Sequence, residues 1–234
     1  MERPRFALLD ASHGATHTRR NFRRELDATL AEFDVTDGAL PETYDYDGVV
    51  ITGSRASVYW DEPWIRSLLE WVEGAADRNL PMLGVCYGHQ VLAEALGGRV
   101  EDMGEYEIGY RTVEHRGGEL FAGIDDSFTV FTTHSDAVVE LPPGAELLAE
   151  NEYGVHAFRA GHAWGVQFHP EYDPGTAEEV TRGKDDQLST ERIESVVSGI
   201  TPEAYDAACE AKQLFENFVD YARRTRGNPT AAAD

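Results

Sequence analysis

The sequence predicts an α/β fold, a mostly parallel sheet with helices on both faces and a small β extension. Over the first hundred residues, short apolar runs of strand length alternate with helix-length segments, a pattern typical of parallel sheets. After Gly98 the pattern changes to short β-like runs separated by Gly, Pro and Asp turns, which predicts an antiparallel portion. A length of 234 residues suits one large domain, so we assign residues 1–226 to a single domain and 227–234 to a disordered tail.

The first half of the chain supplies three expected strands and three expected helices. The strands are placed at residues 6–9, 49–51 and 81–85, and the helices at residues 18–33, 63–76 and 89–96. In the first helix the apolar residues recur at the spacing of one helix face, at Phe22, Leu26, Leu30 and Phe33. Pro63 suits the first turn of the second helix, and Gly97-Gly98 ends the third.

The second half contains the β-like runs and a helical end. The runs are at residues 110–114, 128–133, 146–149, 155–159 and 163–168. Residues 173–201 are polar and acidic, and one short helix is expected there. A last amphipathic helix is expected at residues 202–224, with Tyr205, Leu214, Phe218 and Tyr221 among its apolar positions.

Composition limits the partners of the chain. The formal charge of −23 repels phosphate backbones and anionic lipids, so neither nucleic acid nor a membrane is an expected partner. Only two of the 20 cations are lysine, and this acid-rich, lysine-poor composition favours adaptation to high salt over an ordinary acidic protein. The sequence shows no apolar run long enough for a signal peptide or a membrane span, which predicts a cytoplasmic protein.

The strongest local signal is the segment Gly84-Val85-Cys86-Tyr87-Gly88, where an apolar strand runs directly into a helix. Small flanking residues permit the sharp turn of a nucleophile elbow, which raises the central side chain above the sheet edge. A thiol at a helix N-terminus is stabilised as thiolate, and the Tyr87 N–H is placed to hold an oxyanion. A cysteine between glycines also suits tight strand–helix packing, so this segment alone leaves a structural role open.

A second signal is Gly165-Val166-Gln167-Phe168-His169-Pro170-Glu171, an apolar strand that ends at a histidine. The proline stiffens the turn, so the Glu171 carboxylate can reach one imidazole nitrogen while the other faces a nucleophile. A surface histidine beside a surface glutamate is the alternative for this segment in isolation. Its occurrence together with the elbow favours a Cys-His-Glu triad.

These two motifs, in this order, resemble those of the class I, triad-type glutamine amidotransferases, whose fold is flavodoxin-like. Further similar segments are Ile51-Thr52-Gly53-Ser54, Leu92-Ala93-Glu94-Ala95-Leu96-Gly97-Gly98 and Thr133-His134-Ser135-Asp136, so the resemblance covers about residues 5–172. Within the family the chain is similar to the stand-alone branch related to the amidotransferase domain of GMP synthase. The segments Ser57-Val58-Tyr59, Glu107-Ile108-Gly109-Tyr110 and Leu141-Pro142-Pro143-Gly144-Ala145 carry that similarity.

The resemblance implies an enzyme that hydrolyses the glutamine side-chain amide through a cysteine thioester, with no metal or organic cofactor. Cys86 would be the nucleophile, His169 the base and then the acid, and Glu171 the group that orients His169. Gln90 would contact glutamine, and backbone groups near Gly53, Ser54, Ser135 and Asp136 would hold the oxyanion or the amino-acid end. The chain departs from the family at Gly53-Ser54-Arg55, where Gly-Gly-Pro is usual, and it shows no glycine-rich phosphate loop. The ammonia acceptor is therefore expected to be a separate synthase subunit.

Two other functions remain open at this point. A γ-glutamyl peptide or amide hydrolase would use the same triad, and a catalytically silent regulatory subunit would need none of it. The remaining cysteine and histidines suggest no second site: Cys209 is expected in the core of the last helix, and His89 is expected to pack or cap. His13 and His17 have the spacing of a helical metal pair but no evident third ligand, and His115, His156 and His162 are expected to be solvent-facing or structural.

Overall fold

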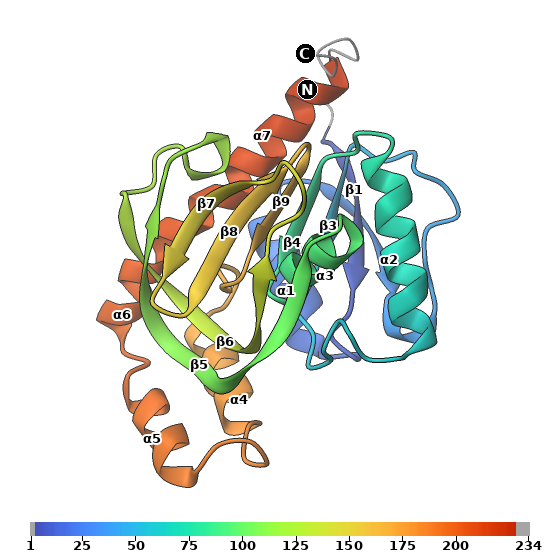
Figure 1. Ribbon diagram of the computed structural model, residues 1–234. Helices are drawn as coiled ribbons and strands as arrows, with labels where there is room; N and C mark the ends of the chain where they lie inside the picture. Colours follow the sequence, from blue (N-terminus) through green and yellow to red (C-terminus); the bar gives the residue numbers. More distant parts are fainter. Residues whose placement is uncertain (1–2, 228–234) are drawn as a thin grey trace.

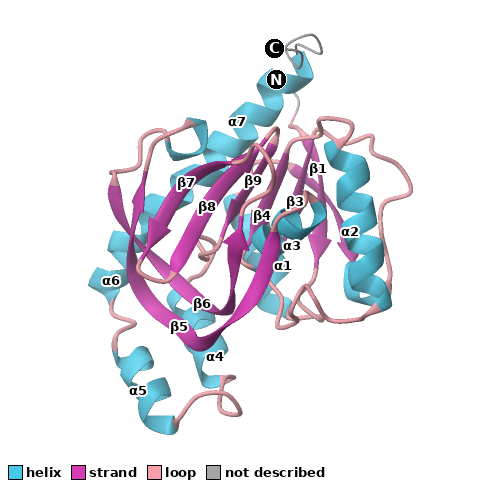
Figure 2. Ribbon diagram, in the orientation of Figure 1, coloured by secondary structure: helices cyan, strands magenta, loops and turns pink. Residues whose placement is uncertain are grey.

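The computed structural model describes residues 3–227, and within this range nine strands form one continuous sheet (Figures 1 and 2). Its order is β2-β1-β3-β4-β9-β8-β7-β5-β6. The strands are β1 Arg5–Asp10, β2 Thr29–Asp34, β3 Gly48–Ile51, β4 Met82–Val85, β5 Arg99–His115, β6 Ser127–Glu140, β7 Glu146–Asn151, β8 Gly154–Ala160 and β9 Ala163–Val166. The α-helices are α1 Thr16–Glu25, α2 Pro63–Ala76, α3 Tyr87–Ala95, α4 Pro174–Arg182, α5 Thr190–Ser198, α6 Pro202–Ala208 and α7 Gln213–Gly227.

The first five strands of that order run parallel; the edge strand β2 is only partly buried, whereas the residues of the other four, except Arg5, are buried on both faces. Phe6 and Leu8 pack in one core with residues of α1 and α7, whereas Ala7 and Leu9 pack in the other with residues of α2 and α3. This alternation follows from the period of two along a strand, and it explains why the inner strands β3, β4 and β9 contain no polar side chain. The predicted α/β class, with helices on both faces, is confirmed.

The antiparallel portion is larger than predicted. The pairings β9–β8, β8–β7, β7–β5 and β5–β6 are antiparallel, so the sheet of the described residues has four antiparallel and four parallel pairings. This portion continues the same sheet through β9 instead of lying against it (Figure 1). Strand β5 spans 17 residues, most of which are polar, whereas only residues 110–114 were expected as strand.

The helix expected at residues 18–33 is wrong in its second half. Helix α1 ends at Glu25, and residues 29–34 form β2, which pairs in parallel with β1. Leu30 packs in the core shared with α1, whereas Phe33 packs in the opposite core, because residues three apart on a strand face opposite sides. The helical spacing of these residues was therefore coincidental.

The C-terminal segment also differs from expectation. Two helices, α4 and α5, occupy the acidic stretch where one was expected, and the last helix is divided into α6, a 3-10 turn at Cys209–Lys212, and α7. Side chains of α4 and α5 contribute Ala177 and Val196 to a small third core against β5 and β6. The tail expected at residues 227–234 lies, from residue 228 on, outside the described residues. Among residues 3–227, none of the helices combines the length and the apolar character needed to cross a membrane.

Candidate active site

Three neighbouring strands end on the same edge of the sheet, and the predicted site residues follow them. Gly53 follows β3, Cys86 follows β4 and His169 follows β9, and these strands are adjacent in the order β3-β4-β9. The carboxyl ends of parallel strands form the usual ligand-binding edge of such sheets. A β-carbon built on Gly53 would lie 2.9 Å from His169 Cε1 and 3.8 Å from Cys86 Cβ, so the three residues converge on one point.

Cys86 occupies the sharp turn that its flanking glycines predicted. Its φ of 53° and ψ of −101° are a strained combination for a residue with a side chain, and it directly precedes α3. A β-carbon on Gly84 would lie 2.2 Å from the Gly88 carbonyl oxygen, and one on Gly88 would lie 2.3 Å from the Ile51 carbonyl oxygen. Both glycines are therefore required by close backbone approach. The first N–H groups of α3, including that of Tyr87, have no partner within the helix.

His169 is buried and held on two sides. Its Nδ1 lies 2.8 Å from Glu171 Oε1, and its ring stacks on Tyr172 with 4.1 Å between the ring centroids. The turn is fixed from outside by Arg24, whose Nη2 donates a hydrogen bond of 2.6 Å to the Glu171 carbonyl oxygen. With Nδ1 occupied by Glu171, the imidazole presents Nε2 to Cys86.

The electrostatics favour a protonated His169. Burial alone would lower the pKa of His169, but the charges of Glu171 and Cys86 and hydrogen bonds to both raise it to about 10. An imidazolium beside a thiolate is the ion pair that activates a cysteine nucleophile at neutral pH. The cysteine sulfur also lies 3.9 Å from the Thr133 carbonyl oxygen.

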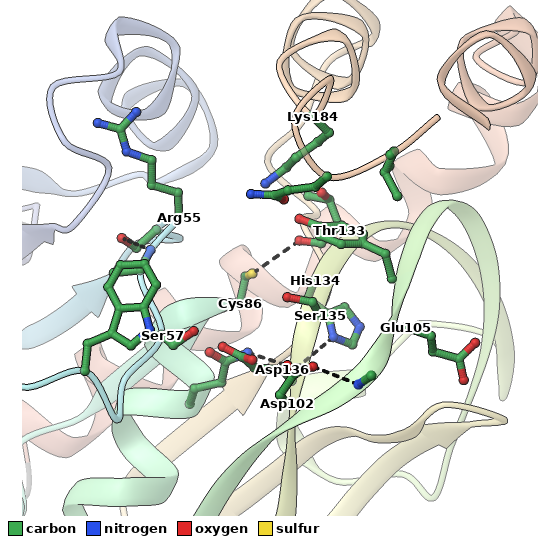
Figure 3. A pocket seen from close by; sticks show the side chains of 18 residues that line it. Arg55, Ser57, Cys86, Asp102, Glu105, Thr133, His134, Ser135, Asp136 and Lys184 are labelled. Atoms are coloured by element: carbon green, nitrogen blue, oxygen red, sulfur yellow. Dashed lines mark hydrogen bonds between the residues drawn. The ribbon is translucent and has the colours of Figure 1, made fainter. Parts of the chain in front are cut away.

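Two cavities meet at Cys86. The first has a volume of about 510 Å³ and is lined by Ser54, Gln90, Ser135 and Asp136 as well as Cys86. The second, of about 340 Å³, reaches Cys86 from the side of Gly53, His169, Glu171 and Tyr172. Figure 3 shows the first cavity, with Cys86 between the wall that carries Arg55 and the wall that carries Thr133 and Ser135. The structure therefore brings the predicted triad residues and most of the predicted binding residues to one place.

Three of the predicted binding residues are held in place by hydrogen bonds or ring packing within the protein. Gln90 Nε2 donates to the Asp136 carbonyl oxygen at 3.1 Å and to Gln167 Oε1 at 3.2 Å, which leaves Gln90 Oε1 to accept from a ligand. The Asp136 carboxylate accepts a hydrogen bond of 2.9 Å from the Tyr59 hydroxyl group. The Tyr87 ring packs against Trp64 in the core, so only its backbone N–H is available to the site.

Several residues at the site were given no role from the sequence. Thr133, Arg55, Lys184 and Gln187 line both cavities, and Tyr172 stacks on His169. Tyr172 follows Glu171 directly and could have been found from its position. Lys184 and Gln187 lie beyond α4, and no motif near them indicated a place at the site.

The other histidines lie outside the triad, although His17 lines the second cavity. His89 is fully buried against Phe158, and burial lowers its pKa to about 3, so its imidazole is neutral. His13 lies in the loop before α1 and His17 lies within α1, so they do not form a pair on one helix. His156 is buried, which excludes its solvent-facing alternative, and it joins Glu107 and His134 in the one group of metal-ligand type found among the described residues.

Comparison with known proteins finds relatives over most of the chain. The family model for class-I glutamine amidotransferases matches residues 7–183. A GMP synthase (glutamine-hydrolysing) from Thermomicrobium roseum is 38% identical over 170 residues, which cover 70% of this chain but only 31% of that protein. The γ-glutamyl peptidase 5 of Arabidopsis thaliana is 33% identical over 194 residues, covering 74% of this chain and 77% of the peptidase.

A solved structure matches over nearly the whole chain. The glutamine amidotransferase from Thermotoga maritima superposes with a TM-score of 0.79 and 24% identity, covering 94% of this chain and 100% of that one. At this identity the likeness concerns the fold, whereas the family model spans most of the chain. The chain belongs to the class-I glutamine amidotransferase family.

Proposed function

We propose that the chain hydrolyses the side-chain amide of glutamine through a thioester on Cys86, with His169 and Glu171 completing the triad. The observation that carries this proposal is the convergence of a strained cysteine, a helix N-terminus and a histidine paired with a buried carboxylate. In this reaction the Cys86 thiolate attacks the glutamine Cδ and forms a C–S bond. The imidazolium of His169 gives its proton to the departing nitrogen, and ammonia leaves as the C–N bond breaks.

The second half-reaction reverses these roles. His169 takes a proton from water, the resulting hydroxide attacks the thioester carbon, and glutamate leaves as the C–S bond breaks. The negative oxygen formed in both halves would be held by the Tyr87 N–H and by backbone groups of Gly53 and Ser54. No bond change in this scheme consumes an oxidant or a cofactor.

The first cavity suits the amino-acid end of glutamine. Arg55 and Lys184 bring positive charge to its lining, and Asp102, Glu105 and Asp136 bring negative charge. A zwitterion with one carboxylate and one ammonium group needs both kinds of partner. We place the α-carboxylate and α-ammonium groups here, near Ser135, Asp136 and the free Oε1 of Gln90.

The ammonia acceptor in this proposal is a separate synthase, of the kind that GMP synthase represents. Support comes from the Thermomicrobium roseum relative, of which the match covers about a third. Free ammonia is protonated and lost in bulk water, so activity of the isolated chain should be low. We expect turnover to rise at least tenfold with the correct partner, which requires only ~1.4 kcal/mol of barrier.

A γ-glutamyl hydrolase is the second candidate, and two observations favour it. The Arabidopsis peptidase matches over most of its own length. The cavity on the His169 side, where the leaving group would depart, has about 340 Å³, whereas one water-sized molecule occupies only about 30 Å³. That space would admit an organic amine in place of ammonia.

One set of assays separates the candidates. Purified chain is given glutamine and a γ-glutamyl amine in parallel, with glutamate, ammonia and free amine measured in molar salt. Glutaminase activity that increases with a partner supports the first candidate, and partner-independent release of amine at ~10 s⁻¹ supports the second. Cys86→Ser should abolish either activity and Cys209→Ala should preserve it. A wild-type chain inactive on both substrates, alone and with partners, would indicate the silent regulatory subunit.

A further inference from the structure

A buried polar cluster lies behind the wall of the first cavity. Glu107 of β5 is fully buried, and its Oε2 lies 2.6 Å from His134 Nε2 and 3.1 Å from His156 Nε2. Its Oε1 accepts a hydrogen bond of 2.7 Å from Asn151 Nδ2, and Arg111 Nε lies 3.9 Å from the same oxygen. Four strands, β5 to β8, thus contribute to one cluster that the proposed chemistry does not use.

The acceptors around His134 show that both of its ring nitrogens donate hydrogen bonds. Its Nδ1 lies 2.9 Å from the Asp136 carbonyl oxygen, which can only accept, so Nδ1 carries a proton. Burial alone would raise the pKa of Glu107, but hydrogen bonds and charges from His134 and His156 lower it to about 2. Glu107 is therefore a carboxylate that also only accepts, and Nε2 of His134 donates to it. His156 needs just one proton, on Nε2, and burial lowers its pKa.

The same three side chains could be taken for a metal site, because their ligand atoms lie within 4.8 Å of one another. The hydrogen-bond geometry favours protons instead. A nitrogen–oxygen distance of 2.6 Å is that of a charge-assisted hydrogen bond. An ion bound by both atoms would take the place of the proton between them.

The cluster is coupled to the cavity through one carbonyl group. The Asp136 carbonyl oxygen accepts from His134 Nδ1 on one side and from Gln90 Nε2 on the other, so both of its lone pairs are used. His134, Ser135 and Asp136 all line the first cavity. The hydrogen bond from Tyr59 holds the Asp136 side chain from the opposite wall.

We propose that Glu107 and His134 are positioning residues for substrate binding. Glu107 holds the His134 ring, whose Nδ1–H fixes the position of the Asp136 carbonyl group. This position determines how Ser135 and Asp136 contact the amino-acid end of the substrate. Neither Glu107 nor His134 touches the reacting atoms. The inference rests on the proposed function only in taking glutamine as the ligand of the first cavity.

A matched pair of substitutions tests the route. In His134→Asn the amide nitrogen takes the place of Nδ1 and can still donate to the Asp136 carbonyl oxygen, whereas in His134→Gln it takes the place of Nε2 and cannot. In a Cys86→Ala background, which binds without reacting, the Kd of L-glutamine is measured by calorimetry at pH 8. We expect His134→Gln to raise the Kd at least tenfold and His134→Asn to raise it less than threefold.

Glu107 supplies a second pair in case His134→Gln does not fold. Glu107→Gln can donate to Nε2 of a neutral His134 that keeps its Nδ1–H, and also to Nε2 of His156 once the single proton of His156 lies on Nδ1, so the Kd should stay within threefold. Glu107→Leu has a similar length but releases His134, and the Kd should rise at least tenfold. With Cys86 intact, alkylation of the thiol by iodoacetamide should be unchanged in every variant, because this reagent does not use the amino-acid site.

The outcomes separate this inference from the proposed function. Equal Kd values within both pairs, or no glutamine binding to the Cys86→Ala protein, would overturn the inference. Stoichiometric zinc in the purified protein would also overturn it, since His134 Nε2 would then be a ligand without a proton. The expected Kd pattern in a protein whose wild type shows no turnover would support the inference and reject the proposed function.

Discussion

Gly53 is the residue at which a single methyl group should uncouple the histidine from the cysteine. The β-carbon of Gly53→Ala would lie 2.9 Å from His169 Cε1, whereas ordinary contact begins near 3.4 Å. The ring cannot yield freely, because Glu171 holds its Nδ1 at 2.8 Å and Tyr172 stacks on its face. The imidazole must therefore move by about 0.5 Å relative to Cys86.

The expected loss follows from the sensitivity of reacting groups to position. A displacement of 1 Å at an active site can cost about 100-fold in rate, so a displacement of half that size should lower kcat by roughly 10-fold. This corresponds to about 1.4 kcal/mol of barrier. The fold should be retained, because Gly53 has no positive φ that an alanine could not adopt.

The assay compares kcat for glutamine, or for the γ-glutamyl amine if that is the substrate, between wild type and Gly53→Ala. Gly175→Ala is the matched control, because its β-carbon would lie at an ordinary 3.5 Å from Asp173 Oδ1 and away from both cavities. Unfolding temperatures establish that each variant is folded. A Gly53→Ala enzyme with kcat within threefold of wild type would refute the argument that Gly53 is needed for the contact between His169 and Cys86.

Three further predictions follow from the charges. Glu171→Gln removes the carboxylate that raises the pKa of His169, so kcat should fall by about 10²- to 10⁴-fold. Iodoacetamide should also alkylate Cys86 at least tenfold more slowly at pH 7. An unchanged alkylation rate would contradict an ion pair between Cys86 and His169. With a formal charge of −23, the unfolding temperature should rise between roughly 0.1 and 3 M KCl, and a flat or falling curve would exclude salt adaptation. Burial alone would raise the pKa of Asp173, but hydrogen bonds from Thr176 and Arg24 and the charge of Arg20 lower it below 3.8. The ionised Asp173 therefore stabilises the fold fully above pH 3.8, and this stabilisation is lost as the pH falls through its lowered pKa. Asp173→Asn keeps an oxygen that accepts from the Thr176 N–H, so this variant loses only the charge. Its free energy of unfolding should be lower than that of wild type by no more than about 1 kcal/mol at pH 5, and this difference should shrink as the pH falls to 3. A difference that stays constant between pH 5 and 3 would contradict the lowered pKa of Asp173.

The members of the candidate site could be named from the sequence because each lies in a local motif at the end of a strand. Each of Gly53, Cys86 and His169 follows a short apolar strand, but the parallel pairing of β9 with β4, which brings His169 to the other two, was not predicted. The elbow glycines also follow from local physics, since the strand and the helix approach too closely for any side chain. The residues that bind or orient through long-range contacts carry no such signal.

The predictions that were wrong or missing share one cause, because they depend on contacts between residues far apart in the sequence. Residues 29–34 have an apolar spacing that a helix would also produce, and only pairing with β1 makes them a strand. Glu107, His134 and His156 are far apart in sequence, and their convergence depends on the register of β5 with β6 and on the position of β8. A sequence without its strand register could not reveal that cluster.

The choice between glutamine and a larger γ-glutamyl substrate lies outside the triad. Cys86, His169 and Glu171 would serve both reactions equally, because each needs the same attack on a γ-carbonyl and the same proton for the leaving nitrogen. The residues that line both cavities come from different parts of the fold. Thr133 belongs to β6, whereas Lys184 and Gln187 belong to the segment after α4. That segment therefore controls how much room the leaving group has beside His169. Substitution of Lys184 and Gln187 should change the preference between glutamine and a γ-glutamyl amine, while alkylation of Cys86 stays constant.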